Sequence, residues 1–291
     1  MNHELVGSDS SAIDEPQHGS ERHNDPAHEL DRRRDVAEMN IVRRVVAVCH
    51  GRKLELLLTL SFALLVGQLA WPSAVYWWRL PTPGRIGLDQ FESATMGKDY
   101  LVYLPEGYGG TEAWPLVVFL HGSGERGTDP DRLRKIGPLR LKLPVIIAVP
   151  QCLPSCSWEP DAVAELVESV ASCYSVDRRR IYLMGFSMGG FSVVQTVAAY
   201  PDLFAAVVPI SGGGNPADGE KLRSLPVWAF HGAIDKTVPL NQSEQMIDAI
   251  DKAGGKAKLT VLPNVGHSIC DTVCSRADLW QWLIKQHRST K

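Results

Sequence analysis

The sequence has little net charge and few cysteines. The formal charge is −3 over 291 residues, so no overall basic field attracts nucleic acid or anionic lipid. Six cysteines are too few for a small domain held together by disulfides. Apolar residues make up 44% and charged residues 22%, which excludes collagen-like, coiled-coil and fully disordered chains. The composition is that of a globular protein with a core large enough for an enzyme.

The first 53 residues differ in composition from the rest of the chain. Residues 1–35 are rich in Asp, Glu, Arg, His and Ser and have almost no aromatic side chain. Such a segment cannot bury enough apolar surface to offset its loss of conformational entropy. Its four histidines fit no metal-ligand spacing. We therefore expect residues 1–53 to form a disordered polar tail that ends in a basic flank.

An apolar run at residues 54–78 follows the basic flank. It is long enough for the ~20-residue helix that a bilayer crossing requires, and tryptophan at its end suits the interface. Three interpretations stay open: a signal anchor, a signal peptide if translation starts at Met39, and a buried core helix. Either of the first two places residues 79–291 outside the membrane, exported to the periplasm or medium or held by the anchor, because positive charge stays inside.

Residues 79–291 alternate short apolar runs with amphipathic stretches. Strands are expected at 100–104, 116–120, 145–148, 181–184, 205–208, 227–230 and 259–262. Helices are expected at 161–173, 188–200, 242–253 and 276–286. Strands that alternate with helices predict an α/β domain with a mostly parallel central sheet and helices on both faces. The disordered tail and one apolar helix precede this domain.

The pattern Gly-x-Ser-x-Gly occupies residues 185–189, between an expected strand and an expected helix. In this context the pattern is typical of a nucleophile elbow, a tight turn that exposes a serine hydroxyl at the end of a strand. The glycines permit the turn, where a Cβ would collide with neighbouring backbone. The sequence therefore predicts Ser187 as a catalytic nucleophile. The alternative is a glycine-rich turn with an idle serine.

A serine hydroxyl needs a base to take its proton and a carboxylate to orient that base. His267 follows the last expected strand, which brings it to the same edge of the sheet as Ser187. Asp235 follows the preceding strand, and the order Ser187, Asp235, His267 is that of an α/β-hydrolase triad. The rival carboxylate is Asp271, which is too close to His267 in sequence to come easily from a separate strand end.

The loop at residues 121–127 follows another expected strand. In this fold the oxyanion hole combines the N–H group after the nucleophile with one from this early loop. We therefore expect the N–H groups of Met188 and Ser123 to form it. Glu125 and Arg126 are expected to form an ion pair that holds the loop, with a role in substrate binding as the alternative.

Other histidines and basic residues receive structural interpretations. His121 and His231 each end an expected strand and precede glycine, so we interpret them as shaping loops. His287 lies in the last expected helix. The segment 128–143 is interpreted as a solvated basic face, with a lid or pocket rim as the alternative.

Four segments, at 120–127, 185–190, 231–235 and 265–267, resemble the serine α/β-hydrolases. They are most similar to the single-domain bacterial group called predicted peptidases, which is related to phospholipase/carboxylesterases, feruloyl esterases and polyhydroxybutyrate depolymerases. The resemblance covers residues 90–287. It implies an eight-stranded type of sheet, ester hydrolysis through an acyl-enzyme, and no cofactor or metal. The implied partner is a small-molecule or carbohydrate ester.

The chain departs from that group near His267. The group's pattern has an aromatic residue shortly after the histidine, where Ile269 and Cys270 stand, and this bears on substrate preference. A cysteine nucleophile would indicate dienelactone hydrolase, but Ser187 occupies that position. Oligopeptidases of the superfamily carry a propeller domain, whereas only a tail and an apolar helix precede the domain here. The alternatives are acyl transfer, hydrolysis of small peptides and a catalytically silent binding domain.

Two pairs of cysteines have the same spacing, Cys152 with Cys156 and Cys270 with Cys274. The short C-x2-C spacing of thiolate metal sites is absent. Export permits disulfides, either within each pair or between the two segments. Cys173 is expected to be a buried apolar residue.

Overall fold

The computed structural model describes residues 81–91, 96–97 and 99–288. The expected polar tail at 1–53 and the expected apolar helix at 54–78 lie outside these residues. Within the described ranges, no helix is long and apolar enough to cross a membrane.

Eight strands form one sheet in the described domain. They are β1 (Ile86–Gln90), β2 (Asp99–Tyr103), β3 (Trp114–Leu120), β4 (Ile146–Pro150), β5 (Val176–Phe186), β6 (Ala206–Ile210), β7 (Val227–Gly232) and β8 (Ala257–Leu262). Their order across the sheet is β1-β2-β4-β3-β5-β6-β7-β8. β2 is antiparallel to β1 and β4, and every other neighbouring pair is parallel. This confirms the mostly parallel sheet that the sequence predicts.

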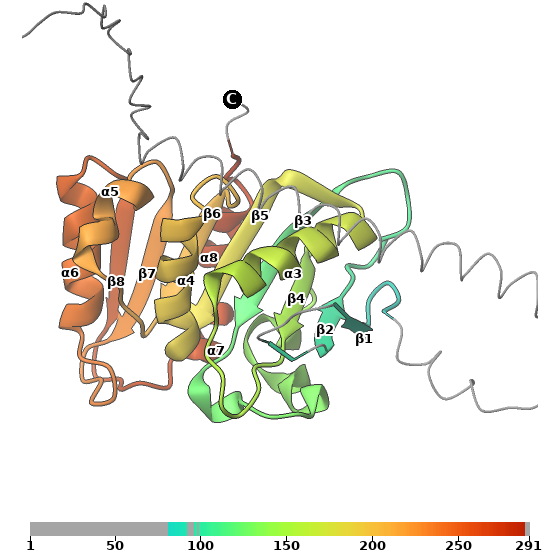
Figure 1. Cartoon of the computed structure of the whole chain (residues 1–291), viewed down its shortest axis with the longest axis horizontal. Helices are drawn as coiled ribbons and strands as arrows, with labels where there is room; N and C mark the ends of the chain where they lie inside the picture. The colour runs from blue at the N-terminus through green and yellow to red at the C-terminus, as the bar shows by residue number, and fades with distance from the viewer. Residues whose placement is uncertain (1–80, 92–95, 98, 289–291) are drawn as a thin grey trace, which may run out of the picture. The chain divides into compact units, whose positions relative to one another are not determined.

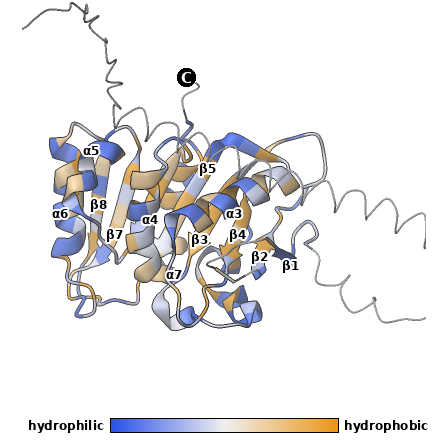
Figure 2. Cartoon of the chain, in the orientation of Figure 1, coloured by the Kyte–Doolittle hydropathy of each residue, from blue (hydrophilic) through white to orange (hydrophobic). Residues whose placement is uncertain are grey.

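Side chains of the central strands alternate between two buried faces. In β3, Leu116, Val118 and Leu120 belong to one hydrophobic cluster. Val117 and Phe119, between them in sequence, belong to the other. A strand buried on both faces needs apolar residues at every position, which explains why these runs lack polar alternation. Figure 2 shows the hydrophobic residues along the strands of the sheet.

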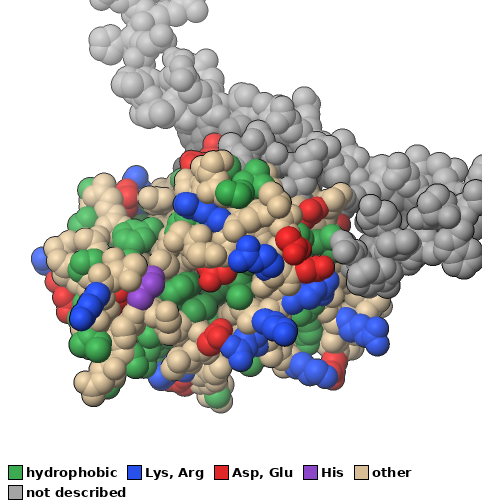
Figure 3. All heavy atoms as spheres, turned by 90° about the horizontal axis from the view of Figure 1, so that it is seen from below, with side chains coloured by type: hydrophobic (Ala, Val, Ile, Leu, Met, Phe, Trp, Pro, Cys, Tyr) green, Lys and Arg blue, Asp and Glu red, His purple; other side chains and the backbone are tan. Residues whose placement is uncertain are grey.

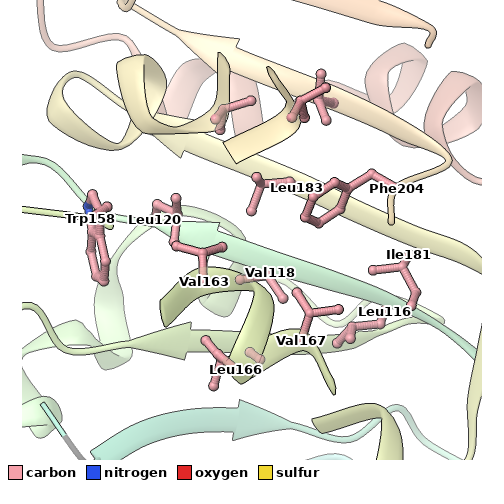
Figure 4. Close-up of a cluster of buried hydrophobic side chains, with 14 of the residues drawn as sticks. Leu116, Val118, Leu120, Trp158, Val163, Leu166, Val167, Ile181, Leu183 and Phe204 are labelled. Carbon is pink, nitrogen blue, oxygen red and sulfur yellow. The ribbon is translucent and has the colours of Figure 1, made fainter. Parts of the chain in front are cut away.

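Helices cover both faces of the sheet (Figure 1). One face carries α3 (Pro160–Cys173), α4 (Met188–Ala199), α5 (Gly219–Leu222) and α6 (Asn241–Lys252), and the other carries α7 (Cys270–Cys274) and α8 (Ala277–Leu283). In α3, Val163, Leu166 and Val167 recur at the spacing of one helix face and lie in the same cluster as β3 (Figure 4). The prediction of helices on both faces is therefore confirmed.

The short elements were not expected from sequence. They are β1, α5, α7 and four 3-10 helices: η1 (Ser123–Glu125), η2 (Pro130–Lys135), η3 (Gly137–Arg140) and η4 (Pro216–Asp218). An element of three to six residues is too short for its hydrophobic period to be recognised. α8 also ends at Leu283, a few residues earlier than expected.

The two cysteine pairs are thiols, so neither arrangement of the expected disulfides is formed. Sγ of Cys152 lies 3.3 Å from the carbonyl oxygen of Cys156. A hydrogen bond with Cys274, together with burial, raises the pKa of the Cys270 thiol well above its ordinary value. Cys270 is therefore protonated at neutral pH and is not a reactive thiolate.

Candidate active site

Three loops meet at the edge of the sheet where its parallel strands end. Ser187 follows β5 directly, Asp235 lies in the loop after β7, and His267 lies in the loop after β8. Figure 3 looks at this edge and shows Lys and Arg side chains gathered over one half of it. Parallel strands present their carboxyl ends on one side, which is why residues far apart in sequence can converge here.

Ser187 occupies a strained backbone conformation between β5 and α4. Its φ is 55° and its ψ is −116°, a combination that residues other than glycine rarely adopt. Its N–H group donates to the carbonyl oxygen of Ile210 at 2.9 Å. A Cβ on Gly189 would lie 2.1 Å from the carbonyl oxygen of Leu120, so glycine is required where α4 begins against β3. This packing presents the serine hydroxyl at the sheet edge.

His267 contacts Ser187 through one ring nitrogen and Asp235 through the other. Its Nε2 lies 2.9 Å from Oγ of Ser187, and its Nδ1 lies 2.7 Å from Oδ2 of Asp235. An ionised carboxylate only accepts hydrogen bonds, so Nδ1 carries the proton and Nε2 can accept the serine O–H. The Phe186 ring packs on the imidazole, with ring centroids 5.0 Å apart. The structure thus brings together the three residues that the sequence singled out.

The Asp235 side chain is fully buried, and each of its oxygens has partners. Oδ1 accepts from the N–H groups of Thr237 at 2.8 Å and Val238 at 2.9 Å, while Oδ2 accepts from His267. Burial acts to raise the pKa of this carboxyl, but the hydrogen bonds outweigh burial and hold the pKa below its ordinary value. Asp235 therefore remains ionised beside His267.

Asp271, the rival carboxylate, lies elsewhere. Its side chain is 53% exposed and pairs with Arg140 of η3. The contact with His267 is made by Asp235 instead. The geometry therefore favours Asp235 as the residue that orients the imidazole.

The loop that carries His267 is held by its neighbours. Oγ of Ser211 donates to the carbonyl oxygen of His267 at 3.1 Å. A Cβ on Gly232 would lie 2.1 Å from the carbonyl oxygen of Gly266, so the loops after β7 and β8 touch at that point. Sequence reasoning missed Ser211. The available signal was the Ser-Gly-Gly-Gly run at 211–214, which follows β6 as the elbow follows β5.

The loop after β3 lies beside the elbow. A Cβ on Gly122 would lie 3.1 Å from the Phe186 ring, directly before Ser187. Ser123 begins η1, and Met188 begins α4, where the first N–H groups have no partner within the helix. Both expected oxyanion donors therefore lie on segments that flank the serine, and their role remains a prediction.

His121 is buried and fixes the backbone of this early loop. Its Nδ1 lies 2.7 Å from the carbonyl oxygen of Gly122, and its Nε2 accepts the N–H of Cys152 at 3.1 Å. The indole of Trp158 donates to the His121 carbonyl at 3.0 Å. Burial, with a smaller contribution from the Arg126 guanidinium, lowers the pKa of His121 to about 4. The neutral ring is thus part of the loop's framework.

Glu125 and Arg126 do not form the expected ion pair. Arg126 donates instead to the sulfur of Met188 at 2.8 Å. Oε2 of Glu125 and Nε of Arg126 are buried and have no hydrogen-bond partner. The physical reason is that η1 ends at Glu125 and the backbone is extended at Arg126, whose guanidinium reaches Met188 instead.

A cavity of about 190 Å³ is lined by sequence neighbours of Ser187 and His267, but not by Ser187, Asp235 or His267 themselves. Its lining includes Gly122, Phe186 and Ser268, which precede or follow the expected site residues in sequence. Among the residues that the structure describes, no cluster of three or more His, Cys, Asp or Glu side chains could hold a metal ion.

The segment 128–143 contributes to the wall of this cavity through Ile136 and Gly137. Glu125 and Asp271 add two carboxylates to the lining. Part of the segment is therefore a pocket rim, the alternative to a purely solvated face.

Residues 157–276 match the model of the Dienelactone hydrolase family. This range, which is about two fifths of the chain, contains Ser187, Asp235 and His267.

Individual relatives are esterases by name. The "Probable carboxylesterase SOBER1-like" of Arabidopsis thaliana is 22% identical over 143 residues, which cover 44% of this chain and 55% of the relative. The "Probable feruloyl esterase C" of Aspergillus terreus is 26% identical over 183 residues, which cover 58% of this chain and 67% of the relative. A solved thermostable esterase superposes with a TM-score of 0.61 at 27% identity, covering 70% of this chain and 63% of its own.

The chain thus spans about half the length of the Arabidopsis relative and less than two thirds of the thermostable esterase. The eight-stranded sheet, the family match and these likenesses agree with one another. The described domain therefore has the α/β-hydrolase fold and is similar in sequence and structure to esterases.

Proposed function

We propose that this chain is a serine hydrolase that cleaves carboxylic esters. The observation that carries the proposal is the hydrogen-bonded series from Ser187 through His267 to Asp235, with contacts of 2.9 and 2.7 Å. This series contains a nucleophile, a base and the carboxylate that orients the base. The likeness to carboxylesterases and feruloyl esterases supports the same reaction class.

In the first half of the reaction, Oγ of Ser187 attacks the carbonyl carbon of the ester. Nε2 of His267 takes the hydroxyl proton, and Asp235 stabilises the imidazolium that forms. The N–H groups of Met188 and Ser123 hold the oxyanion of the tetrahedral intermediate. His267 then gives its proton to the leaving alcohol, which leaves an acyl group on Ser187. In the second half, water repeats these steps and releases the acid.

The substrate is a small-molecule or carbohydrate ester. Acetylxylan and feruloyl esterases among the relatives point to acyl groups carried on carbohydrate. The cavity next to the site has a volume of about 190 Å³, and its lining includes the carboxylates of Glu125 and Asp271. A long acyl chain there would desolvate the exposed carboxylate of Asp271 at a cost in free energy. We therefore expect acetate and butyrate esters to be cleaved faster than decanoate esters.

The first experiment is hydrolysis of p-nitrophenyl esters from acetate to decanoate by the full chain, beside the Ser187→Ala variant. We expect the variant to lose turnover by on the order of 10⁴-fold or more, because it removes the nucleophile. A fluorophosphonate probe should label the unaltered chain and leave the variant unlabelled. Turnover that survives the substitution would refute the proposal. Labelling without turnover would point instead to an ester outside this series.

We also propose, from sequence alone, that residues 54–78 target the domain across a membrane or anchor it there. Their apolar character and the basic flank before them support this. Fractionation of cells that express the full chain tests it. Activity in the membrane or periplasmic fraction is expected, and activity confined to the soluble cytosol would contradict it.

A further inference from the structure

His231 lies at the end of β7, four residues before Asp235, and its side chain is fully buried. Its Nε2 lies 3.3 Å from Oδ2 of Asp235, the same oxygen that accepts from His267. The buried carboxylate therefore has imidazoles on two sides. One of them contacts the serine and the other does not.

The partners of His231 determine which of its two ring nitrogens carries a proton. Nε2 lies 2.9 Å from the carbonyl oxygen of Val238 as well as near Asp235. Both of these oxygens only accept hydrogen bonds, so Nε2 must carry a proton. The N–H group of Val238 in turn donates to Oδ1 of Asp235 at 2.9 Å. One imidazole thus holds both the turn at 235–238 and the carboxylate that the turn carries.

The opposite side of the His231 ring is held by α6. Nδ1 lies 2.7 Å from Oγ of Ser243, and this Oγ lies 2.8 Å from the carbonyl oxygen of Gly212. Ser243 is 3% exposed, so water does not compete for this contact. Gly212 packs against Gly190 of α4, where a Cβ would lie 2.6 Å from the Gly190 carbonyl carbon. The orientation of the ring is therefore set by elements on both sides of it.

We propose that His231 is a positioning residue for the reaction. Its Nε2–H donates to the carbonyl oxygen of Val238 and lies beside Oδ2 of Asp235, and so holds the turn at 235–238 where Oδ2 meets Nδ1 of His267. This inference rests on the proposed function, in which Asp235 orients His267. It assigns His231 a task beyond shaping a loop, because the effect is transmitted to a single carboxylate oxygen.

Two amide substitutions separate the positioning role from a general structural role. In His231→Gln, the amide nitrogen reaches the position of Nε2 and can still donate to the carbonyl oxygen of Val238, beside Asp235. In His231→Asn, the shorter amide reaches only the position of Nδ1, so the donor near Asp235 is lost. The two variants are matched in polarity and charge, and their unfolding temperatures report whether each one is folded.

We expect His231→Asn to lower kcat by about tenfold to a hundredfold, with KM changed by less than about twofold, because the donor that holds the turn carrying Asp235 is lost. His231→Gln should remain within about threefold of the unaltered chain. Equal kcat in two folded variants, whether high or low, would overturn the proposal. If His231→Asn does not fold, Ser243→Ala tests the same point by releasing the ring, and an unchanged kcat would then count against it.

A double substitution tests whether His231 acts through Asp235. When Asp235→Asn is already present, adding His231→Asn should lower kcat by less than about threefold more, because residues that act as a unit are not additive. Multiplied losses would overturn the proposal. All variants are also compared by their rate of labelling with a fluorophosphonate, which needs an activated Ser187 but no ester. If the unaltered chain is labelled but does not turn over the p-nitrophenyl esters, the substrate lies outside this series, and the labelling rates of the variants still test the role of His231.

Discussion

Ser187 has a strained backbone conformation, and its hydroxyl lies within hydrogen-bonding distance of Nε2 of His267. The positive φ of 55° is maintained because Gly189 approaches β3 and the Ser187 N–H is bonded to Ile210. Strain at a functional residue persists only where the surrounding structure fixes it. Here the packing around the elbow supplies that restraint, and the hydroxyl lies at Nε2 of His267 without rearrangement.

The two candidate carboxylates can be separated by substitution. Asp235→Asn should lower kcat by about 10³-fold to 10⁴-fold, because the amide no longer fixes the Nδ1–H form of His267 or stabilises its imidazolium. Asp271→Asn should change kcat by less than about threefold, since the exposed pair with Arg140 contributes little. Steady-state kinetics on one p-nitrophenyl ester measure both. A large loss confined to the Asp271 variant would transfer the role to that residue.

The candidate site residues could be identified from sequence alone, because each of them comes shortly after an expected strand. Ser187, Asp235 and His267 each follow an apolar run, and parallel strands end on one side of a sheet. The contacts of Ser211 with His267 and of Ser243 with His231 could not be foreseen. They join loops from different strands, and no periodicity in the sequence records which loops will touch.

At the scale of elements, the junction between β3 and α4 depends on a glycine. Gly189→Ala would place a methyl group 2.1 Å from the carbonyl oxygen of Leu120, which is backbone and cannot move aside cheaply. We expect the free energy of unfolding to fall by at least about 2 kcal/mol. Urea unfolding measures it.

Gly124→Ala is the matched control for that measurement. Gly124 lies in η1, close to the same site, and a Cβ there would have no neighbour within 4 Å. Its free energy of unfolding should stay within about 0.5 kcal/mol of the unaltered chain. If both variants lose the same free energy of unfolding, the close contact of residue 189 with Leu120 is not the cause of the loss.

Long elements were predicted well, and short ones were missed. The seven expected strands and four expected helices all occur, because each has enough residues to show a period of two or 3.6 or a continuous apolar run. β1 and α7 have five residues each. The conformation of each depends on its tertiary contacts. β1 pairs with β2. Val273 of α7 is buried in the hydrophobic cluster between the sheet and α7 and α8.

Over the whole described domain, acid should destabilise the fold. The pKa of His121 is lowered to about 4 by burial, so the unfolded chain binds a proton first as the pH falls from 6.5. This contribution to stability is complete above pH 6.5 and is lost between pH 6.5 and about 4, by about 3 kcal/mol. The lowered pKa of Asp235 acts in the same direction at still lower pH. Urea unfolding at pH 7 and pH 4.5 should show the loss.

His121→Gln is the control for the pH dependence, because its side chain has no charge at either pH. Its free energy of unfolding should be lower at pH 7, where the contacts of the imidazole with Gly122 and Cys152 are disturbed. It should change less than that of the unaltered chain between pH 7 and pH 4.5. Parallel pH dependences would show that other groups dominate the acid response.

β8 lies at the edge of the sheet and pairs with β7 on one side, while β5 lies in the interior with a neighbour on each side. Residues along β8 are mostly half-buried or exposed. An edge strand with few buried contacts opens at lower cost than a central one. The base is thus attached to an edge of the sheet, which we expect to open at lower cost, and the nucleophile to its interior, which we expect to open at higher cost. On warming, we expect the catalytic activity to be lost at a temperature below that at which the whole domain unfolds. The activity should return on cooling.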